Sequence, residues 1–488
     1  MTSPIDNSDT PVSLDSAFSP VSRQQWVDMA IAGLGSDNND ALQALRRTTL
    51  EGIPLEVLYD SMDTITPSLG EKSSSTLDNR LCVRTSDAAL ASKNILQGLQ
   101  GGIHSIELHA QSPDYIATAL SGVKLDLAPV SLRANHDYEQ CTQALLALAD
   151  TQDLENGECI FTLNVDPVSN ALAKGTGDAQ MFNELARMAS FTSSTAAQLT
   201  SSKCVLVDTA LHHNAGASTV EELHAALATA TLYLEALLDN GMSPRPASEQ
   251  IVFQIALDAD ILLGVAKIRA LRALWQVVLA HFDTDNTLPH HTHIVAESSQ
   301  RFLSKRQPWN NHLRNLCAGT AAMLGGADTL MVHPHDVLHR ADACADTTLG
   351  ERMARNMPII LERECGLGHV QDPMAGSYAI ENLTRQLMQH AWQSLSSTDT
   401  GEGWVSELLS GRWQTRLTNT HKQRITLMQQ EQRIAVGVNR FVQADELFNA
   451  TSDQSEGLST NAFSSSSALK AVRESQIFET AALSEISS

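Results

Sequence analysis

The chain has 488 residues and a formal net charge of −23, from 33 basic against 56 acidic side chains. This acidic excess argues against nucleic acid or an anionic membrane as a partner, because both attract patches of lysine and arginine. No apolar run approaches the roughly 18 residues of a membrane span, and no charged-then-apolar leader opens the chain, so we expect a cytoplasmic protein.

Residues 1–80 are predicted to form an N-terminal extension that precedes the main domain. Residues 1–20 are rich in Ser, Pro, Thr and Asp, a composition typical of disorder. Apolar residues at helical spacing then predict two short helices, at Arg23–Leu34 and Asn38–Arg46.

From residue 81 onward, short β-rich runs alternate with stretches of helical periodicity. The predicted strands are Leu81–Arg84, Ser105–His109, Ser131–Arg133, Cys159–Val165, Cys204–Ala210, Ile251–Leu257, His293–Glu297 and Thr329–His333. The predicted helices between them are Ala89–Gln100, Pro113–Leu120, Tyr138–Ala149, Phe182–Ala189, Val220–Leu238, Ile261–Phe282 and Asn310–Leu324. Eight alternations favour an α/β fold of the (β/α)8 TIM-barrel type over residues 81–400. An open doubly wound sheet is disfavoured because its glycine-rich dinucleotide fingerprint is absent.

The stretch Ile261–Phe282 carries one apolar stripe, which is expected to pack on the barrel. Lys267, Arg269 and Arg272 lie off that stripe. We expect these three cations to be solvated, or paired with the abundant carboxylates, rather than to bind a ligand.

Helical periodicity continues after the eighth strand, at Leu349–Cys365 and Asn382–Ser394, with a turn-rich segment between them. We assign residues 401–442 to a C-terminal helical segment. Composition then shifts to Ser, Asn, Asp and Gln, so residues 443–488 are predicted to be a linker or tail containing one helix, Ala471–Leu483.

The cysteines and histidines do not follow a known metal-ligand pattern. The seven cysteines include no CxxC pair and are expected to be reduced, mostly buried thiols. Two groups of histidines could chelate a metal, but no carboxylate or cysteine accompanies them at a known ligand spacing, so we predict no metal site. These groups are His290, His291 and His293, and His333, His335 and His339.

Four segments resemble the acyl-CoA mutases that use adenosylcobalamin, typified by methylmalonyl-CoA mutase. VAKIRALRALW, for example, is similar to the family's V-A-K-L-R-A-A-R-x-L-W. The segments are Arg46–Tyr59, Val265–Trp275, Ala296–Arg314 and Ala354–Trp392. The resemblance covers about Arg23 to Val442 and implies the same barrel fold.

The resemblance also implies that the family's site residues have been replaced here. The catalytic Tyr-His pair falls on Ala210 and Leu211, and the arginine that opens the next strand falls on Gln250. The leading Arg of R-T-S-G falls on Glu297, and the Gln of the following S-L-T-x-Q-D-P run on Arg306. His212 and His213 would restore an imidazole only by a one-residue slip, which reverses the face in a strand. We therefore expect no catalytic residue in this chain.

The cobalamin-binding, flavodoxin-like domain of the family is expected to be absent, since its D-x-H-x-x-G motif does not occur. The resemblance is nearest to the small (beta) subunits of heterodimeric methylmalonyl-CoA mutases. It implies a large catalytic subunit as partner, which holds adenosylcobalamin and isomerises (R)-methylmalonyl-CoA to succinyl-CoA, while this chain binds no cofactor. Two alternatives remain: the catalytic barrel of a split, isobutyryl-CoA mutase-like enzyme, and a free-standing acyl-CoA-binding or scaffold protein.

Overall fold

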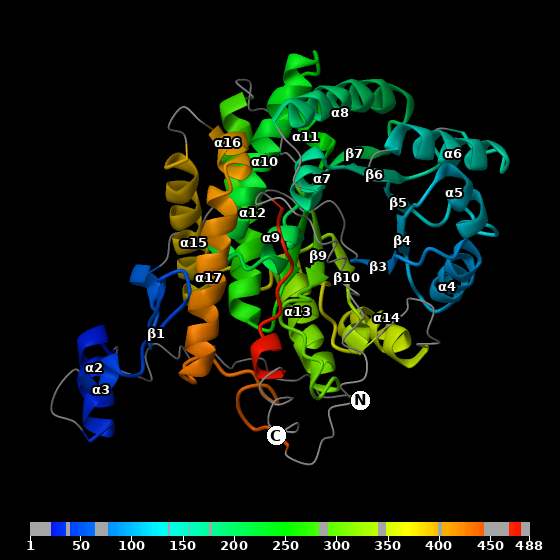
Figure 1. Cartoon of the computed structure of the whole chain (residues 1–488). Helices are drawn as coiled ribbons and strands as arrows, with labels where there is room; N and C mark the ends of the chain where they lie inside the picture. The colour runs from blue at the N-terminus through cyan, green and yellow to red at the C-terminus, as the bar shows by residue number, and fades with distance from the viewer. Residues whose placement is uncertain are drawn as a thin grey trace, which may run out of the picture. The chain divides into compact units, whose positions relative to one another are not determined.

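The computed structural model describes residues 21–35, 40–63, 77–134, 137–155, 157–174, 178–282, 291–339, 348–398, 403–443 and 468–479 (Figure 1). The chain divides into two units, Met1–Asp60 and Ser61–Ser488. Residues 1–20, which were predicted to be disordered, lie outside the described residues.

In the first unit, two helices precede a two-stranded antiparallel sheet. The elements are α2 (Arg23–Gly33), α3 (Asp40–Gln43), β1 (Arg47–Thr48) and β2 (Pro54–Leu55). Helix α2 begins with a capping box, in which Ser22 and Gln25 each accept a hydrogen bond from the other's backbone N–H. This unit therefore agrees with the two short helices expected there.

The second unit is built on eight parallel strands that close into a barrel, as the alternation predicted. Around the barrel they follow the order β10-β3-β4-β5-β6-β7-β8-β9, so β10 closes against β3. The strands are β3 (Asp78–Val83), β4 (Ser105–His109), β5 (Val130–Arg133), β6 (Phe161–Val165), β7 (Lys203–Asp208), β8 (Ile251–Leu257), β9 (His293–Ser298) and β10 (Thr329–Met331).

Helices surround the barrel, and several begin at a side chain that caps their free backbone N–H groups. Asp87 caps α4 in this way, and Ser218 and Glu221 form a capping box at the start of α10. The helices are α4 (Ala88–Gln100), α5 (Pro113–Ala119), α6 (Tyr138–Asp150), α7 (Pro167–Lys174), α8 (Asp178–Gln198), α9 (Ala210–Asn214), α10 (Thr219–Asp239), α11 (Pro244–Glu249), α12 (Ile261–Phe282), α13 (Asn310–Gly325), α14 (Thr348–Arg363), α15 (Tyr378–Ser396), α16 (Gly403–Leu409) and α17 (Arg412–Gln429); η1 (Ser61–Asp63) and η2 (Val337–His339) are short 3-10 turns. No helix of the described part of the chain is both long and apolar enough to cross a membrane.

Helix α12 is buried on more sides than its apolar stripe indicated. Lys267, Arg269 and Arg272 are at most 4% exposed, so of the two expected states, solvated or paired with carboxylates, the structure shows the second. Each is paired: Lys267 with Glu222 of α10, Arg269 with Glu381 of α15 at 2.7 Å, and Arg272 with Asp328 at 3.3 Å. These ion pairs fasten α12 to its neighbours, because a buried cation is tolerated only where an anion meets it.

Strand β7 ends at Asp208, two residues earlier than predicted. The Oδ1 atom of Asp208 accepts a hydrogen bond from the backbone N–H of Ala210 at 3.1 Å, which turns the chain into α9. Ala210, Leu211, His212 and His213 therefore lie on a helix, and the argument that they alternate across a strand was wrong.

The last described segment, residues 468–479, lies across the carboxyl end of the barrel. Its backbone donates hydrogen bonds to carbonyls of Leu172, Asn214 and Arg301, which follow β6, β7 and β9 respectively. In Figure 1 this segment is red and runs past α9 toward α13. The helix predicted to begin at Ala471 does not begin there, because residues 468–473 are not helical. Within this segment only residues 476–479 are helical. The rest of the predicted helix lies outside the described residues.

Candidate functional site at the carboxyl end of the barrel

The five positions where the family's site residues are replaced do not come together. Glu297 points into the barrel from β9, whereas Ala210 and Leu211 lie on α9 outside the strands. Arg306 lies in the loop after β9, partly buried. Gln250 precedes β8 and thus lies at the amino end of the barrel, opposite the end where barrel enzymes keep their chemistry.

A network of charged and amide side chains crosses the barrel interior near its carboxyl end. Arg133 of β5 contacts Asp208 of β7 at 2.7 Å, and its Nε atom lies 3.2 Å from Glu107 of β4. Its Nη2 atom donates to Gln254 of β8 at 2.6 Å, and Gln254 donates to Glu297 of β9 at 3.0 Å. Strands β5 and β9 are four places apart in the ring of eight, so they face each other. The network therefore spans the barrel axis.

An apolar cluster lies below this network in the barrel interior. Leu206, Val252, Val295 and Met331 form a buried cluster there, with Cys82 packed against it. Side chains of five strands thus fill the axis at this level, as in other closed barrels.

Burial and ion pairing together set the charges of the network. Burial acts to raise the pKa of Glu107, but Arg133 and the hydrogen bond from His109 outweigh it and hold the pKa below its ordinary range. Burial lowers the pKa of His109 to about 4. Burial raises the pKa of Asp208 to about 6, against the lowering effect of Arg133. At neutral pH the carboxylates are therefore charged and His109 is neutral.

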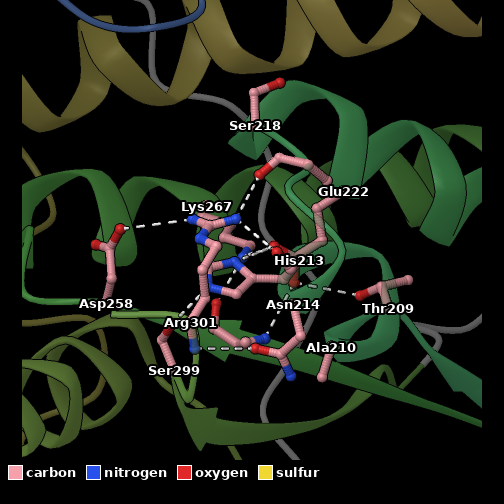
Figure 2. A network of polar contacts seen from close by, with 12 residues as sticks. Thr209, Ala210, His213, Asn214, Ser218, Glu222, Asp258, Lys267, Ser299 and Arg301 are labelled. Carbon is pink, nitrogen blue, oxygen red and sulfur yellow. Dashed lines mark hydrogen bonds and ion pairs between the residues drawn. The ribbon is translucent and has the colours of Figure 1, made fainter. Parts of the chain in front are cut away.

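A second network lies beside the first, where α9, α10, α12 and the loop after β9 meet (Figure 2). His213 Nδ1 lies 3.1 Å from Glu222, and His213 Nε2 lies 2.8 Å from the Ser299 hydroxyl. A serine, a histidine and an acid in this order resemble a nucleophilic triad. However, all three are at most 4% exposed, and Glu222 is already paired with Lys267. We interpret the arrangement as structural.

One carboxylate of the segment 468–479 lies in a cluster of arginines. Glu474 is 2% exposed and lies 3.1 Å from Arg301, 3.3 Å from Arg424 and 3.3 Å from Arg433. Burial acts to raise the pKa of Glu474, but the three guanidinium groups outweigh the effect of burial, so the pKa is lowered. Glu474 is therefore an anion at neutral pH, and its ion pairs hold this segment on the barrel.

Helix α17 brings one of these arginines to the loop that follows α9. Arg424 donates to the carbonyl oxygens of Gly216 at 3.0 Å and Ala217 at 3.1 Å. Gly216 has φ of +112° and its absent Cβ would lie 2.9 Å from His421, so only glycine fits this approach.

The histidine groups behave as core and loop residues within the described part of the chain. His293 lies 3.3 Å from the Thr329 hydroxyl, His333 contacts Gln300 at 3.0 Å, and His335 stacks on His312 and Trp309. Neither group forms a cluster of three metal-binding side chains among the described residues.

Only three of the six described cysteines are buried: Cys141, Cys159 and Cys204. Cys82 and Cys317 are partly buried and Cys365 is exposed, so the expectation of mostly buried thiols was too broad. Cys344 lies outside the described residues.

The sequence reasoning missed Cys82, Glu107 and His109, whose side chains meet inside the barrel. Glu107 and His109 are two residues apart on β4 and so share the inner face, and Cys82 is the strand partner of Glu107. The sequence signal for this group is the Glu-x-His pattern of Glu107 and His109 at the end of the predicted strand Ser105–His109. This pattern is not part of the motifs on which the family resemblance rests.

Comparisons with known proteins agree with this architecture. The family model for methylmalonyl-CoA mutase matches residues 98–488. The chain is 30% identical over 459 residues to the methylmalonyl-CoA mutase small subunit of Streptomyces virginiae, which covers 89% of this chain and 72% of that one. It is 35% identical over 306 residues to the probable methylmalonyl-CoA mutase small subunit of Mycobacterium tuberculosis, and this match covers 62% of this chain and 48% of that one.

A third relative, the small subunit of Propionibacterium freudenreichii subsp. shermanii, is 30% identical over 319 residues, covering 64% of this chain and 48% of that one. The matched part therefore spans about half the length of the last two relatives. Because the family model and these small subunits match most of the chain, and the structure is the closed parallel barrel expected of them, the chain belongs to the methylmalonyl-CoA mutase family.

Proposed function

We propose that this chain is the small, non-catalytic subunit of a methylmalonyl-CoA mutase. Its partner is a large subunit that isomerises (R)-methylmalonyl-CoA to succinyl-CoA with adenosylcobalamin. In this assignment the chain stabilises the large subunit and performs no chemistry of its own.

The observation that carries the proposal is the network across the barrel axis. Arg133 alone contacts three other strands, through Glu107, Asp208 and Gln254. A ligand entering along the axis would have to break these buried contacts, and separating one partner of a buried pair costs about 3–5 kcal/mol. An acyl-CoA site in this barrel is therefore disfavoured.

The residues at the barrel mouth do not fit adenosylcobalamin. Ala210 and Leu211 provide no polar side chain on α9, and the segment 468–479 covers the loops after β6, β7 and β9. Glu474 fills the cluster of arginines there with a carboxylate of the same chain. We therefore place the cofactor in the partner subunit and derive no step through it in this chain.

The proposal is tested by expressing the chain with and without a large catalytic mutase subunit. We expect the two chains to co-purify, and turnover of methylmalonyl-CoA to require the large subunit. The chain alone, supplied with adenosylcobalamin, should give no turnover. Turnover by the chain alone would favour the split-mutase alternative, and failure to co-purify would favour a free-standing protein; either result would contradict the proposal.

A substitution inside this barrel tests whether the chain contributes a catalytic group to the complex. Glu297→Gln removes a buried charge from the network inside the barrel with little change of shape, and in the complex it should alter turnover by less than about twofold. A catalytic group is commonly worth about 10²–10⁴ in rate, so a loss of that size would indicate chemistry in this chain.

A further inference from the structure

We propose that Cys82, Glu107 and His109 form a binding site for a transition-metal ion of the zinc type, with its fourth position open to water. This inference goes beyond the proposed function and does not depend on it. It rests on the geometry, access and charge of three side chains inside the barrel.

The three donor atoms are arranged as the corners of one face of a metal-centred tetrahedron. Cys82 Sγ lies 3.6 Å from Glu107 Oε1 and 3.6 Å from His109 Nε2, and these two atoms are 3.0 Å apart. Metal bonds of about 2.3 Å to sulfur and 2.0–2.2 Å to nitrogen and oxygen, at the tetrahedral angle, give edges of roughly 3.3–3.6 Å. A shift of a few tenths of an ångström therefore brings all three into coordination range.

The barrel backbone holds these donors in place. Cys82 and Glu107 are partners in the β3–β4 ladder, and His109 follows Glu107 on the same face. Sites built on strands are positioned more accurately than sites on loops. The arrangement therefore needs no movement of the backbone to bind an ion.

An ion can reach the three donors from the mouth of the barrel. The His109 side chain is 28% exposed and Cys82 is partly exposed, while Glu107 lies deeper, at 1%. Three protein ligands with one exposed side are typical of zinc sites that keep water in the fourth position.

The charges around the donors favour a divalent cation. Three carboxylates, Glu107, Asp208 and Glu297, face two guanidinium groups, Arg84 and Arg133, which leaves one negative charge in excess. This excess of negative charge attracts a cation to the three donors.

Arg133 supports the site instead of competing for it. Its Nε atom lies 3.2 Å from Glu107 Oε1, and Asp208 holds the other end of the guanidinium at 2.7 Å. A carboxylate oxygen has two lone pairs, so Glu107 can keep its ion pair with Arg133 while it binds a metal. Such outer-shell partners orient the ligand in known metal sites.

The donor types select the metal. A thiolate with an imidazole and a carboxylate suits zinc or cobalt, whereas magnesium and calcium take oxygen ligands alone. Cobalt(II) is therefore a spectroscopic probe for this site, because its bond to a thiolate gives a charge-transfer band.

The experiment titrates the untagged full chain, first stripped with a chelator, with Co²⁺ and then with Zn²⁺. We expect one Co²⁺ per chain with a thiolate charge-transfer band, and displacement of that band by one Zn²⁺. Cys82→Ser should abolish the band, and His109→Gln should weaken Zn²⁺ binding by more than the roughly 10–100-fold that loss of an outer-shell partner costs.

Matched controls separate this site from adventitious binding. Cys317→Ser alters the second of the two described cysteines that are partly buried, and it should leave the band and the stoichiometry unchanged. His291→Gln removes an exposed histidine outside the site and should also change neither. Circular dichroism and thermal melting show whether each variant is folded; should Cys82→Ser not fold, His109→Gln and Cys82→Ala provide the same readout. A band that persists in a folded Cys82 variant, or no band in the parent chain, would overturn the proposal.

Discussion

Replacing Glu474 by glutamine removes the carboxylate that pairs with two buried arginines and one partly buried arginine, while keeping the shape of the side chain. Arg301, Arg424 and Arg433 all lie within 3.3 Å of it. Asp258 is the other nearby carboxylate, at 4.0 Å from Arg301 and 3.5 Å from Arg433, so it compensates only in part. Removing one partner of a buried pair costs about 3–5 kcal/mol. We expect the free energy of unfolding to fall by about that amount.

The corresponding fall in melting temperature follows from the size of the unit. At about 2.1 cal/mol/K per residue, a unit of about 430 residues unfolds with an entropy near 0.9 kcal/mol/K, so Tm should fall by about 3–5 °C. The measurement is urea denaturation at neutral pH, supported by calorimetry. Glu431→Gln is the control, because Glu431 pairs with Arg440 in an exposed position and such pairs are worth about 0–1 kcal/mol.

The dependence on pH distinguishes the charge of Glu474 from its shape. Its pKa is lowered in the folded chain, so its stabilisation is present above the unfolded pKa of about 4.3 and is lost as pH falls through the folded value. The difference between the parent chain and Glu474→Gln should therefore shrink in acid. A loss below about 1 kcal/mol at neutral pH, or a difference that does not change with pH, would refute the reasoning.

Three further predictions concern the barrel. Lys267→Met leaves the Glu222 carboxylate buried without its ammonium partner, so urea denaturation should show a loss of about 3–5 kcal/mol in the free energy of unfolding. The double variant with Glu222→Gln should lose less than the sum of the two single variants, and strict additivity would argue against the ion pair. Burial lowers the pKa of His212 and His213 to about 4 and that of His224 to about 3, so only the unfolded chain binds protons just below pH 6.5. The free energy of unfolding should then fall as pH drops from about 6.5 toward 4, by about 1.4 kcal/mol per pH unit for each histidine. In His213→Gln, urea denaturation should show a smaller change of the free energy of unfolding per pH unit, and an unchanged dependence on pH would contradict this prediction. Because the network fills the barrel axis, calorimetry should find that the isolated chain binds methylmalonyl-CoA with a dissociation constant weaker than about 1 μM, and a tighter value would show that the axis admits the ligand.

The barrel was predictable because short β-rich runs and helical stretches alternate regularly along the sequence. Ser105–His109, Ile251–Leu257 and Ile261–Phe282 have the bounds that the sequence indicated. Helix α8 is longer than the predicted Phe182–Ala189, since it continues through a Ser- and Thr-rich stretch whose helix propensity is poor. There, packing in the folded chain overrides local preference.

The candidate site was harder to predict than the fold. Sequence periodicity placed Arg269 on the polar side of its helix, but its carboxylate partners Asp372 and Glu381 lie more than a hundred residues later. Likewise, only the barrel ring brings Arg133 to Gln254, 121 residues away. Ion pairs between such distant residues leave no local pattern, so their burial could not be derived from spacing.

The pairing of Arg301 with Glu474 also fixes an order of events during synthesis. The two residues are 173 positions apart, so a ribosome that adds about 5–20 residues per second completes Glu474 about 9–35 s after Arg301. During that interval Arg301 has no carboxylate from the 468–479 segment, although Asp258, which lies 4.0 Å from it in the folded chain, has already been made. The strands can therefore pair while the chain is still being made, but their carboxyl end settles only when this last described segment has emerged.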